Sequence, residues 1–238
     1  MMELKAQFDQ GQAAIARLAK GEYDLAEATK IGDKTLGCID EGIEYACYRL
    51  AGSGRLLGEE QAVALVEKFG LDVGYHSDCG AVRKYLVEGA GVLDPSDEEV
   101  DAEAKRWSEQ IARMAKTKAV EMPLERPEHH IALCAYYDGT GQMTSCKGLP
   151  LGFIVSRTIL PHDYAIAEMV TATDIATNHG FNDLFTHEHP FLLVAVGRDQ
   201  DQAQELEEEL KTHALRQLTE SQQGRVKVIS IHLQRIRL

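Results

Sequence analysis

Residues 58–82, GEEQAVALVEKFGLDVGYHSDCGAV, join a helix to a strand that ends at chemically active side chains. Residues 59–70 begin with two glutamates and end at a glycine, which is typical of an amphipathic helix. Residues 71–76 are a short apolar run, which predicts a buried strand. His76 and Cys79 follow directly and lie three positions apart. The stretch therefore predicts an α/β arrangement with a candidate metal-binding pair at the end of a strand.

A second apolar run, KTLGCID (residues 34–40), predicts another buried strand, with Cys38 near its end. Functional residues of a parallel sheet gather just past the carboxyl ends of its strands. If these two strands are neighbours, Cys38 meets His76 and Cys79 at one edge of the sheet. Two thiolates and an imidazole suit zinc. Three such ligands leave a fourth position for water or for the carboxylate of Asp40, two residues beyond Cys38.

The rest of the chain alternates predicted helices and strands. A capping box formed by Ser96 and Glu99 marks the beginning of a helix over residues 96–121. The turn GTGQM, after the strand predicted at 130–138, indicates a return strand. The other predicted elements are a helix over 162–180, a strand over 189–197, a helix over 199–221 and a strand over 225–233. The sequence thus indicates an α/β fold with a mostly parallel β-sheet flanked by helices, and we find no internal repeat.

The chain divides most simply into three segments. Residues 1–30 form an N-terminal helical arm, with apolar side chains at roughly helical spacing (Leu4, Phe8, Ile15 and Leu18). Residues 31–147 form the core that contains the candidate zinc ligands. Residues 148–238 form a C-terminal α/β extension that we expect to pack on the same domain.

Composition and charge exclude several classes of function. The net charge of the 238-residue chain is −13, which opposes binding to nucleic acid or to an anionic membrane surface. No apolar run approaches the roughly 20 residues of a membrane span, and the N-terminus lacks the pattern of a signal peptide. We therefore expect a cytoplasmic protein without disulfides, in which the cysteines other than Cys38 and Cys79 pack as small apolar side chains (Cys47, Cys134 and Cys146).

Several of these motifs, taken together, resemble the β-class carbonic anhydrases. That family has C-x-D-x-R at the end of its first strand and H-x-x-C-G after a later strand, and this chain has Cys38-Ile39-Asp40 and His76-Ser77-Asp78-Cys79-Gly80. The segment YRLAGS, with Arg49, Ala51 and Gly52, is similar to the family's R-N-A-G segment. ALCAYYDGTGQM is similar to its G-x-x-Y-D-x-x-T-G hairpin, so the resemblance covers roughly residues 34–143.

The resemblance implies a β-carbonic-anhydrase-like fold with Zn²⁺ on Cys38, His76 and Cys79. Asp40 and Arg49 are then the candidate catalytic residues, with Asp40 orienting the zinc-bound water or taking the fourth site itself. The implied activity is that of a lyase, the reversible hydration of carbon dioxide (CO₂) to bicarbonate by zinc-bound hydroxide. The family also implies a homodimer or a higher homo-oligomer, because residues of two chains line its active sites.

One departure from the family pattern leaves alternatives open. Gly42 stands where the family has the arginine that pairs with the aspartate. Arg49 or Arg83 could supply the missing cation, or Glu41 could take over in a rearranged loop. Without such a replacement, Asp40 closes the site and the chain is a non-catalytic or repurposed zinc-binding protein. A hydrolase of a CO₂-like molecule, carbonyl sulfide or carbon disulfide, is a further hypothesis that the sequence does not separate from CO₂ hydration.

Other histidines have simpler interpretations. His187 and His189 precede a predicted strand, where a surface loop is favoured over a second metal site or a proton shuttle. His129 and His130 are interpreted as a solvated entry into a strand. Trp107, within a long predicted helix, is interpreted as a core residue.

Overall fold

The computed structural model describes residues 2–29, 32–44, 46–124, 131–178 and 181–233. These residues form two four-stranded sheets, and every strand pairing is parallel. The first sheet has the order β2-β1-β3-β4. Its strands are β1 (Asp33–Gly37), β2 (Ala46–Arg49), β3 (Asp72–Tyr75) and β4 (Ala119–Glu121). An α/β fold with parallel strands flanked by helices is therefore confirmed.

Three helices belong to this first unit: α2 (Glu59–Phe69), α3 (Gly80–Glu88) and α4 (Asp97–Met114). Both hydrogen bonds of the predicted capping box are present, so Ser96 fixes the beginning of α4. The predicted length of this helix was wrong, because it ends at Met114 and residues 119–121 form β4. Lys116 has a left-handed backbone (φ 56°), which ends the helix and lets the chain enter the sheet.

The second sheet has the order β6-β5-β7-β8. Its strands are β5 (Cys134–Asp138), β6 (Gly152–Ser156), β7 (Phe191–Gly197) and β8 (Val226–His232), and its helices are α5 (His162–Asn178), α6 (Gln200–Glu209) and α7 (Glu220–Gln223). All residues of β5, β6 and β7 are buried, as is typical of mainly apolar strands in a sheet covered on both faces. The predicted return strand was wrong: β6 runs parallel to β5, and residues 139–151 cross over between them.

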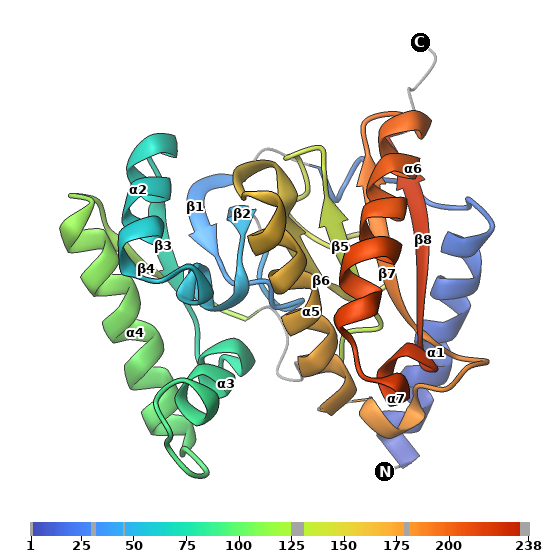
Figure 1. The fold of residues 1–238 in the computed structure, drawn as a ribbon, viewed down its shortest axis with the longest axis horizontal. Helices are drawn as coiled ribbons and strands as arrows, with labels where there is room; N and C mark the ends of the chain where they lie inside the picture. Colours follow the sequence, from blue (N-terminus) through green and yellow to red (C-terminus); the bar gives the residue numbers. More distant parts are fainter. Residues whose placement is uncertain (1, 30–31, 45, 125–130, 179–180, 234–238) are drawn as a thin grey trace.

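The two sheets repeat one topology. In each, the second strand lies on one side of the first, the third lies on the other side, and the fourth follows the third. The units lie side by side (Figure 1), where the Ile154 N–H donates to the Ile39 carbonyl (3.0 Å) and the Arg49 N–H donates to Ser156 Oγ (2.9 Å). The sequence itself shows no internal repeat, because the two units share a strand order and no sequence motif.

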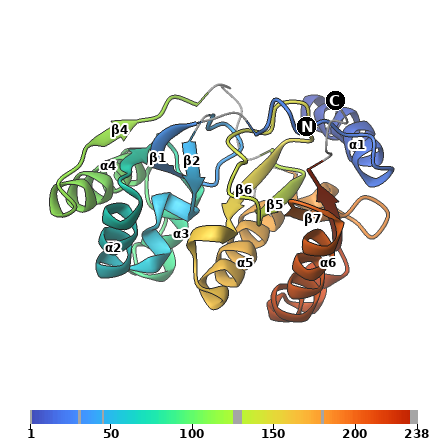
Figure 2. The same ribbon diagram turned by 90° about the horizontal axis from the view of Figure 1, so that it is seen from above.

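This arrangement bears on the predicted segments. The second sheet takes β5 from residues 31–147 and its other strands from residues 148–238, so the two segments share one sheet. Helices α2, α3, α5 and α6 lie on one face of the strands, and α1 (Met2–Ala19) lies on the other (Figure 2). The predicted N-terminal helix is thus present. Its Phe8 ring packs edge-on against Phe181 and Phe185, with centroids 5.2 and 5.6 Å away.

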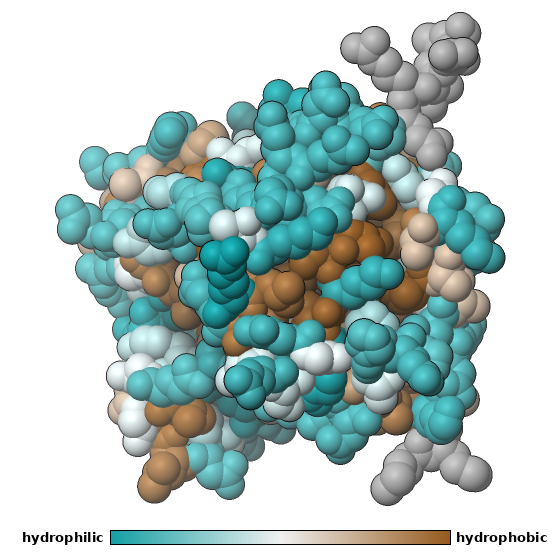
Figure 3. All heavy atoms as spheres, turned by 45° about the vertical axis from the view of Figure 1, so that its right-hand side comes forward, coloured by the Kyte–Doolittle hydropathy of each residue, from teal (hydrophilic) through white to brown (hydrophobic). Residues whose placement is uncertain are grey.

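Hydrophilic side chains cover most of the face shown in Figure 3 and surround an apolar area near its centre. In the part of the chain that the structure describes, no helix combines the length and the apolar character that a membrane span requires.

Candidate metal centre

Cys38, His76 and Cys79 come together at the carboxyl edge of the first sheet. Cys38 directly follows β1 and His76 directly follows β3, and these strands are parallel neighbours. Cys79 immediately precedes α3, and its Sγ lies 3.6 Å from Cys38 Sγ. The ligand atoms of the three residues all lie within 4.8 Å of one another. The structure therefore brings together the three residues predicted from the sequence, and the buried group could hold a metal ion.

The histidine of this cluster is oriented for coordination. Its Nδ1 lies 2.8 Å from the Ser77 carbonyl oxygen, which can only accept, so Nδ1 carries the proton. The Nε2 atom is consequently the ring nitrogen left for a metal ion, which would displace any proton there. It is buried, and no hydrogen bond of ordinary geometry reaches it. A hydrogen bond from one ring nitrogen to a carbonyl, with the other nitrogen left free, is the usual arrangement of a metal-binding histidine.

The pKa values of the three cluster residues show which protons a metal ion would replace. The hydrogen bond from Cys79 lowers the pKa of the Cys38 thiol well below its ordinary value, and the same contact raises the pKa of Cys79. Burial lowers the pKa of His76, but the adjacent Cys38 thiolate outweighs it and raises this pKa to about 9. The Gly52 N–H also donates to Cys38 Sγ (3.3 Å). A buried thiolate held by donors is a chemical environment that a metal ion suits, with release of the other protons.

The space beside the cluster is small. A cavity of about 10 Å³ is lined by the cluster together with Tyr75, Val82 and Ser108, among others. Such a volume accommodates about one water molecule. The three cluster residues are at most 3% exposed, so solvent has little access to them.

Asp40 lies outside this cluster. Its side chain is buried, and Oδ1 accepts a hydrogen bond from the Gly42 N–H (2.8 Å). The group of mutually close ligand atoms contains Cys38, His76 and Cys79, and Asp40 is not a member. A Cβ atom at Gly42 would lie 3.0 Å from Leu124 Cδ2 and 3.1 Å from Asp40 Oδ1. The loop therefore has little room for an arginine, the residue that β-class carbonic anhydrases have at the similar position.

Arg49 holds the loop that carries Cys38 and Asp40. The side chain is fully buried, and its guanidinium donates to four main-chain carbonyls (Cys38, Asp40, Ile43 and Thr144). The other two proposed replacements are placed differently. Arg83 forms ion pairs with Asp78 (3.0 Å) and Asp97 (2.5 Å), and Glu41 accepts from the Ile131 N–H (2.7 Å). Arg49 is thus the cation of this loop, where it binds main-chain oxygens.

Glu168 approaches this site and was missed in the sequence. It lies on α5 in the second unit and is 1% exposed, and its Oε2 accepts from the Ala51 N–H (2.6 Å). Its Oε1 is buried without a hydrogen-bond partner. Burial raises the pKa of Glu168 to about 8, against the Ala51 hydrogen bond and with a smaller contribution from Cys38. A lone carboxylate in the apolar stripe Ala165, Glu168, Met169 and Ala172 was the available signal.

The remaining candidates stand apart from the cluster. His187 and His189 are exposed in a loop before β7, as interpreted, and His129 and His130 lie outside the described residues. Trp107 is 2% exposed and belongs to the core, as predicted. Among the described residues, Cys47, Cys134 and Cys146 do not belong to any group that could hold a metal.

Comparison of the chain with protein-family models, with curated proteins and with solved structures finds no match.

Proposed function

We propose that Cys38, His76 and Cys79 bind a zinc ion. The donor set supports zinc over harder ions, because two sulfurs and one imidazole nitrogen suit a borderline-soft metal. The observation that carries this proposal is the meeting of these three buried side chains, whose ligand atoms all lie within 4.8 Å of one another.

We further propose that the chain is a carbonic anhydrase-like zinc enzyme, a lyase that hydrates CO₂ reversibly to bicarbonate. The position of Asp40 supports this, because three protein ligands leave a fourth position open, as in catalytic zinc sites. A zinc ion in such a site acts as a Lewis acid that makes hydroxide available near neutral pH. Carbonyl sulfide and carbon disulfide are linear molecules of the same kind, and the same site would admit a hydrolase acting on them.

The chain's own residues would support this chemistry in three ways. Arg49 fixes the backbone at Cys38 and Asp40 through its contacts with their carbonyls. The Gly52 N–H bonds the sulfur of Cys38, and Asp40 is restrained by the Gly42 N–H. The burial of the cluster excludes bulk water and strengthens each of these polar contacts.

The experiment is stopped-flow CO₂ hydration from pH 7 to 9, scored per bound zinc. We expect turnover above the buffer rate that disappears in Cys79→Ser together with the zinc. Cys146→Ser is the matched control, because this buried thiol donates to the Gly152 carbonyl (3.0 Å) and a hydroxyl can do the same. Turnover that persists in Cys79→Ser without zinc would contradict the proposal, as would inactivity with a full complement of zinc.

A second candidate is a non-catalytic zinc site. The small cavity favours it, because about 10 Å³ holds one water but not a second reactant beside it. This candidate predicts tightly held zinc, no hydration at any pH and no exchange of the ion with small-molecule ligands such as cyanide. In the form suggested by Gly42, Asp40 would become the fourth ligand after a movement of its loop.

The expected homodimer or higher homo-oligomer and the expected cytoplasmic location belong to the same proposal. The apolar area in Figure 3 supports an oligomer. Within a single chain, the second unit already contributes one residue near the site, since Glu168 comes from α5.

A further inference from the structure

Two consecutive N–H groups connect Glu168 to the metal centre. The Ala51 N–H donates to Glu168 Oε2 (2.6 Å), and the next N–H along the chain, that of Gly52, donates to Cys38 Sγ (3.3 Å). Both belong to the short 3₁₀ turn Ala51–Ser53, which is buried throughout. Loss of the hydrogen bond between Ala51 and Glu168 therefore changes the direction of the Gly52 N–H, which faces the Cys38 sulfur.

This turn has an unfavourable backbone conformation, which a contact from outside the turn can stabilise. Gly52 (φ 54°) and Ser53 (φ 53°) are both left-handed, and for Ser53 this conformation is strained. A Cβ atom at Gly52 would lie 3.0 Å from Arg55 Cβ and 3.3 Å from Val82 Cγ2, so a larger residue would be crowded at this position. Glu168 supplies a short hydrogen bond to Ala51 from α5.

We propose that Glu168 is a positioning residue of the metal centre, and this rests on the proposed zinc site. Its carboxyl anchors the Ala51–Ser53 turn so that the Gly52 N–H points at the Cys38 sulfur. A hydrogen bond to a ligand sulfur withdraws electron density from it and fixes its orientation toward the metal. The second unit thus acts on the centre of the first through one side chain and one turn.

The test uses the full chain loaded with Co²⁺, whose sulfur-to-cobalt charge-transfer bands report the electron density on the ligand sulfurs. Glu168→Gln keeps an oxygen acceptor for Ala51, whereas Glu168→Met keeps the length of the side chain and removes the acceptor. We expect E168Q to retain the bands and the Co²⁺ affinity. We expect E168M to shift the bands and to weaken Co²⁺ binding by about ten- to a hundredfold.

Thr173→Val is the control on the same helix. Thr173 is fully buried and its hydroxyl donates to the Met169 carbonyl, so the substitution perturbs α5 without touching the turn. It should leave the spectrum and the Co²⁺ affinity unchanged. If E168M does not fold, Glu168→Ala removes the same acceptor with less bulk, and the amide proton shift of Gly52 in E168Q against the unsubstituted chain reports the hydrogen bond directly.

The outcomes separate this inference from the proposed site. Unchanged bands and affinity in E168M or E168A would overturn the positioning role, as would lost affinity in E168Q with an unmoved Gly52 amide shift. A chain that binds neither Co²⁺ nor Zn²⁺ before any substitution would instead overturn the metal site on which the inference rests.

Discussion

The two units of this chain have the same strand order and different strand ends. In the first unit, the residues that follow β1 and β3 are Cys38 and His76. In the second unit, the residues that follow the corresponding strands β5 and β7 are Gly139 and Arg198. The fold therefore does not dictate the chemistry; the side chains just past the strand ends do.

The second unit fills its strand ends with internal hydrogen bonds. The carboxylate of Asp138, at the end of β5, accepts from four donors in the following turn, contributed by Thr140, Gly141 and Met143. Nearby, Glu209 accepts from the Tyr137 hydroxyl (2.5 Å) and from Arg157 Nε (3.0 Å). This edge satisfies its own polar groups, whereas the edge of the first unit gathers two cysteines and a histidine in one buried cluster. The comparison favours the first unit as the place of the proposed metal site and the second as its support.

The largest expected effect is on metal content. We expect about one zinc per chain for the unsubstituted protein and almost none for Cys79→Ser after dialysis, because a three-ligand site loses one thiolate. Cys146→Ser, the buried thiol of the second unit, should keep the full complement. Metal analysis after gel filtration measures both. Equal loss from the two variants would mean that the two units do not differ as the strand ends indicate.

The next effect is at the junction, where Arg49 and Ser156 end the corresponding strands β2 and β6. We expect Arg49→Lys to lower the free energy of unfolding by about 3–5 kcal/mol, because an ammonium cannot reach the four carbonyls that the buried guanidinium binds. Ser156→Ala should cost about 1 kcal/mol, since it removes one acceptor for the Arg49 N–H.

Urea denaturation of the two variants measures this difference. R49K should also release zinc more readily, because the loop bearing Cys38 loses its hold, whereas S156A should not. Similar unfolding free energies for R49K and S156A would argue against the loop-holding role of the guanidinium.

A third effect distinguishes the buried carboxyls of the two units by pH. Burial raises the pKa of Glu168 from 4.5 to about 8. Between these values the folded chain binds a proton that the unfolded chain has released, so stability falls as the pH rises. Glu168→Gln removes this titration. We expect E168Q to exceed the unsubstituted chain in stability by on the order of 3 kcal/mol at pH 8, with little difference at pH 5.

Asp138→Asn is the counterpart in the second unit. The substitution places an amide NH₂ group, which is a donor, against an N–H group that now donates to the carboxylate. We therefore expect it to lower the free energy of unfolding by about 1–3 kcal/mol at both pH values. Urea midpoints with chelator present, from pH 5 to pH 8, measure both variants. Parallel pH profiles for E168Q and the unsubstituted chain would show that Glu168 is ionised when folded.

The sequence predicted those parts of the site that depend on local pattern. His76 and Cys79 follow a short apolar run, and Cys38 ends another, so parallel pairing of the two strands sufficed to bring them together. The capping box at Ser96 fixed one helix end in the same way. Nothing local predicts that Glu168 reaches Ala51, because that contact joins residues far apart in the chain. The repeated topology was also hidden, since β2 is a four-residue strand and the two units share no motif.

The position of Asp40 depended on a contact that the sequence pattern does not show. The sequence pattern left two roles open for this carboxylate: it could orient the zinc-bound water or close the site as a fourth ligand. The Gly42 N–H, which binds Oδ1, holds it outside the ligand group in this structure. Asp40 thus takes a backbone partner from within its own loop.

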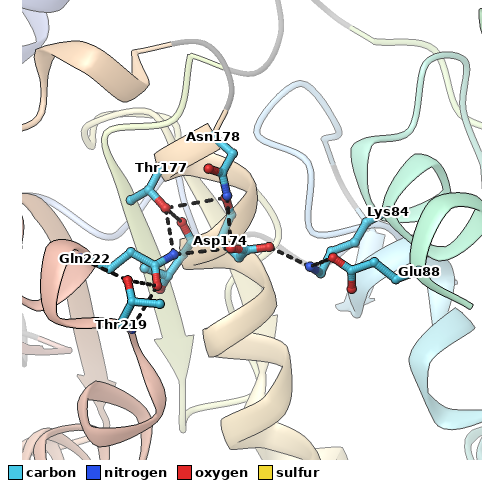
Figure 4. Close-up of polar contacts among 8 residues, drawn as sticks. Lys84, Glu88, Asp174, Thr177, Asn178, Thr219 and Gln222 are labelled. Atoms are coloured by element: carbon cyan, nitrogen blue, oxygen red, sulfur yellow. Dashed lines mark hydrogen bonds and ion pairs between the residues drawn. The ribbon is translucent and has the colours of Figure 1, made fainter. Parts of the chain in front are cut away.

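The smallest expected effect concerns the ion pair that links the two units beyond the sheet junction. Lys84 on α3 contacts Asp174 on α5 (2.5 Å) and Glu88 (2.6 Å), and Figure 4 shows Asp174 also facing Asn178 and Gln222. Both partners are partly exposed, 22% and 32% for Lys84 and Asp174, so water screens their attraction. We expect a coupling free energy of about 1 kcal/mol or less.

A double-mutant cycle of Lys84→Met and Asp174→Asn, followed by urea denaturation, measures this coupling. The exposed pair Lys5 and Asp9 is the control and should give a smaller value, because its side chains are 64% and 59% exposed. Since α3 begins immediately after Cys79, the same variants also test whether the ion pair affects the metal centre. We expect zinc affinity to stay within about twofold, because the sheet junction and the Glu168 contact already connect the units without it. If the coupling were well above that of Lys5 and Asp9 and zinc binding were weaker, the second unit would also affect the metal centre of the first through α3.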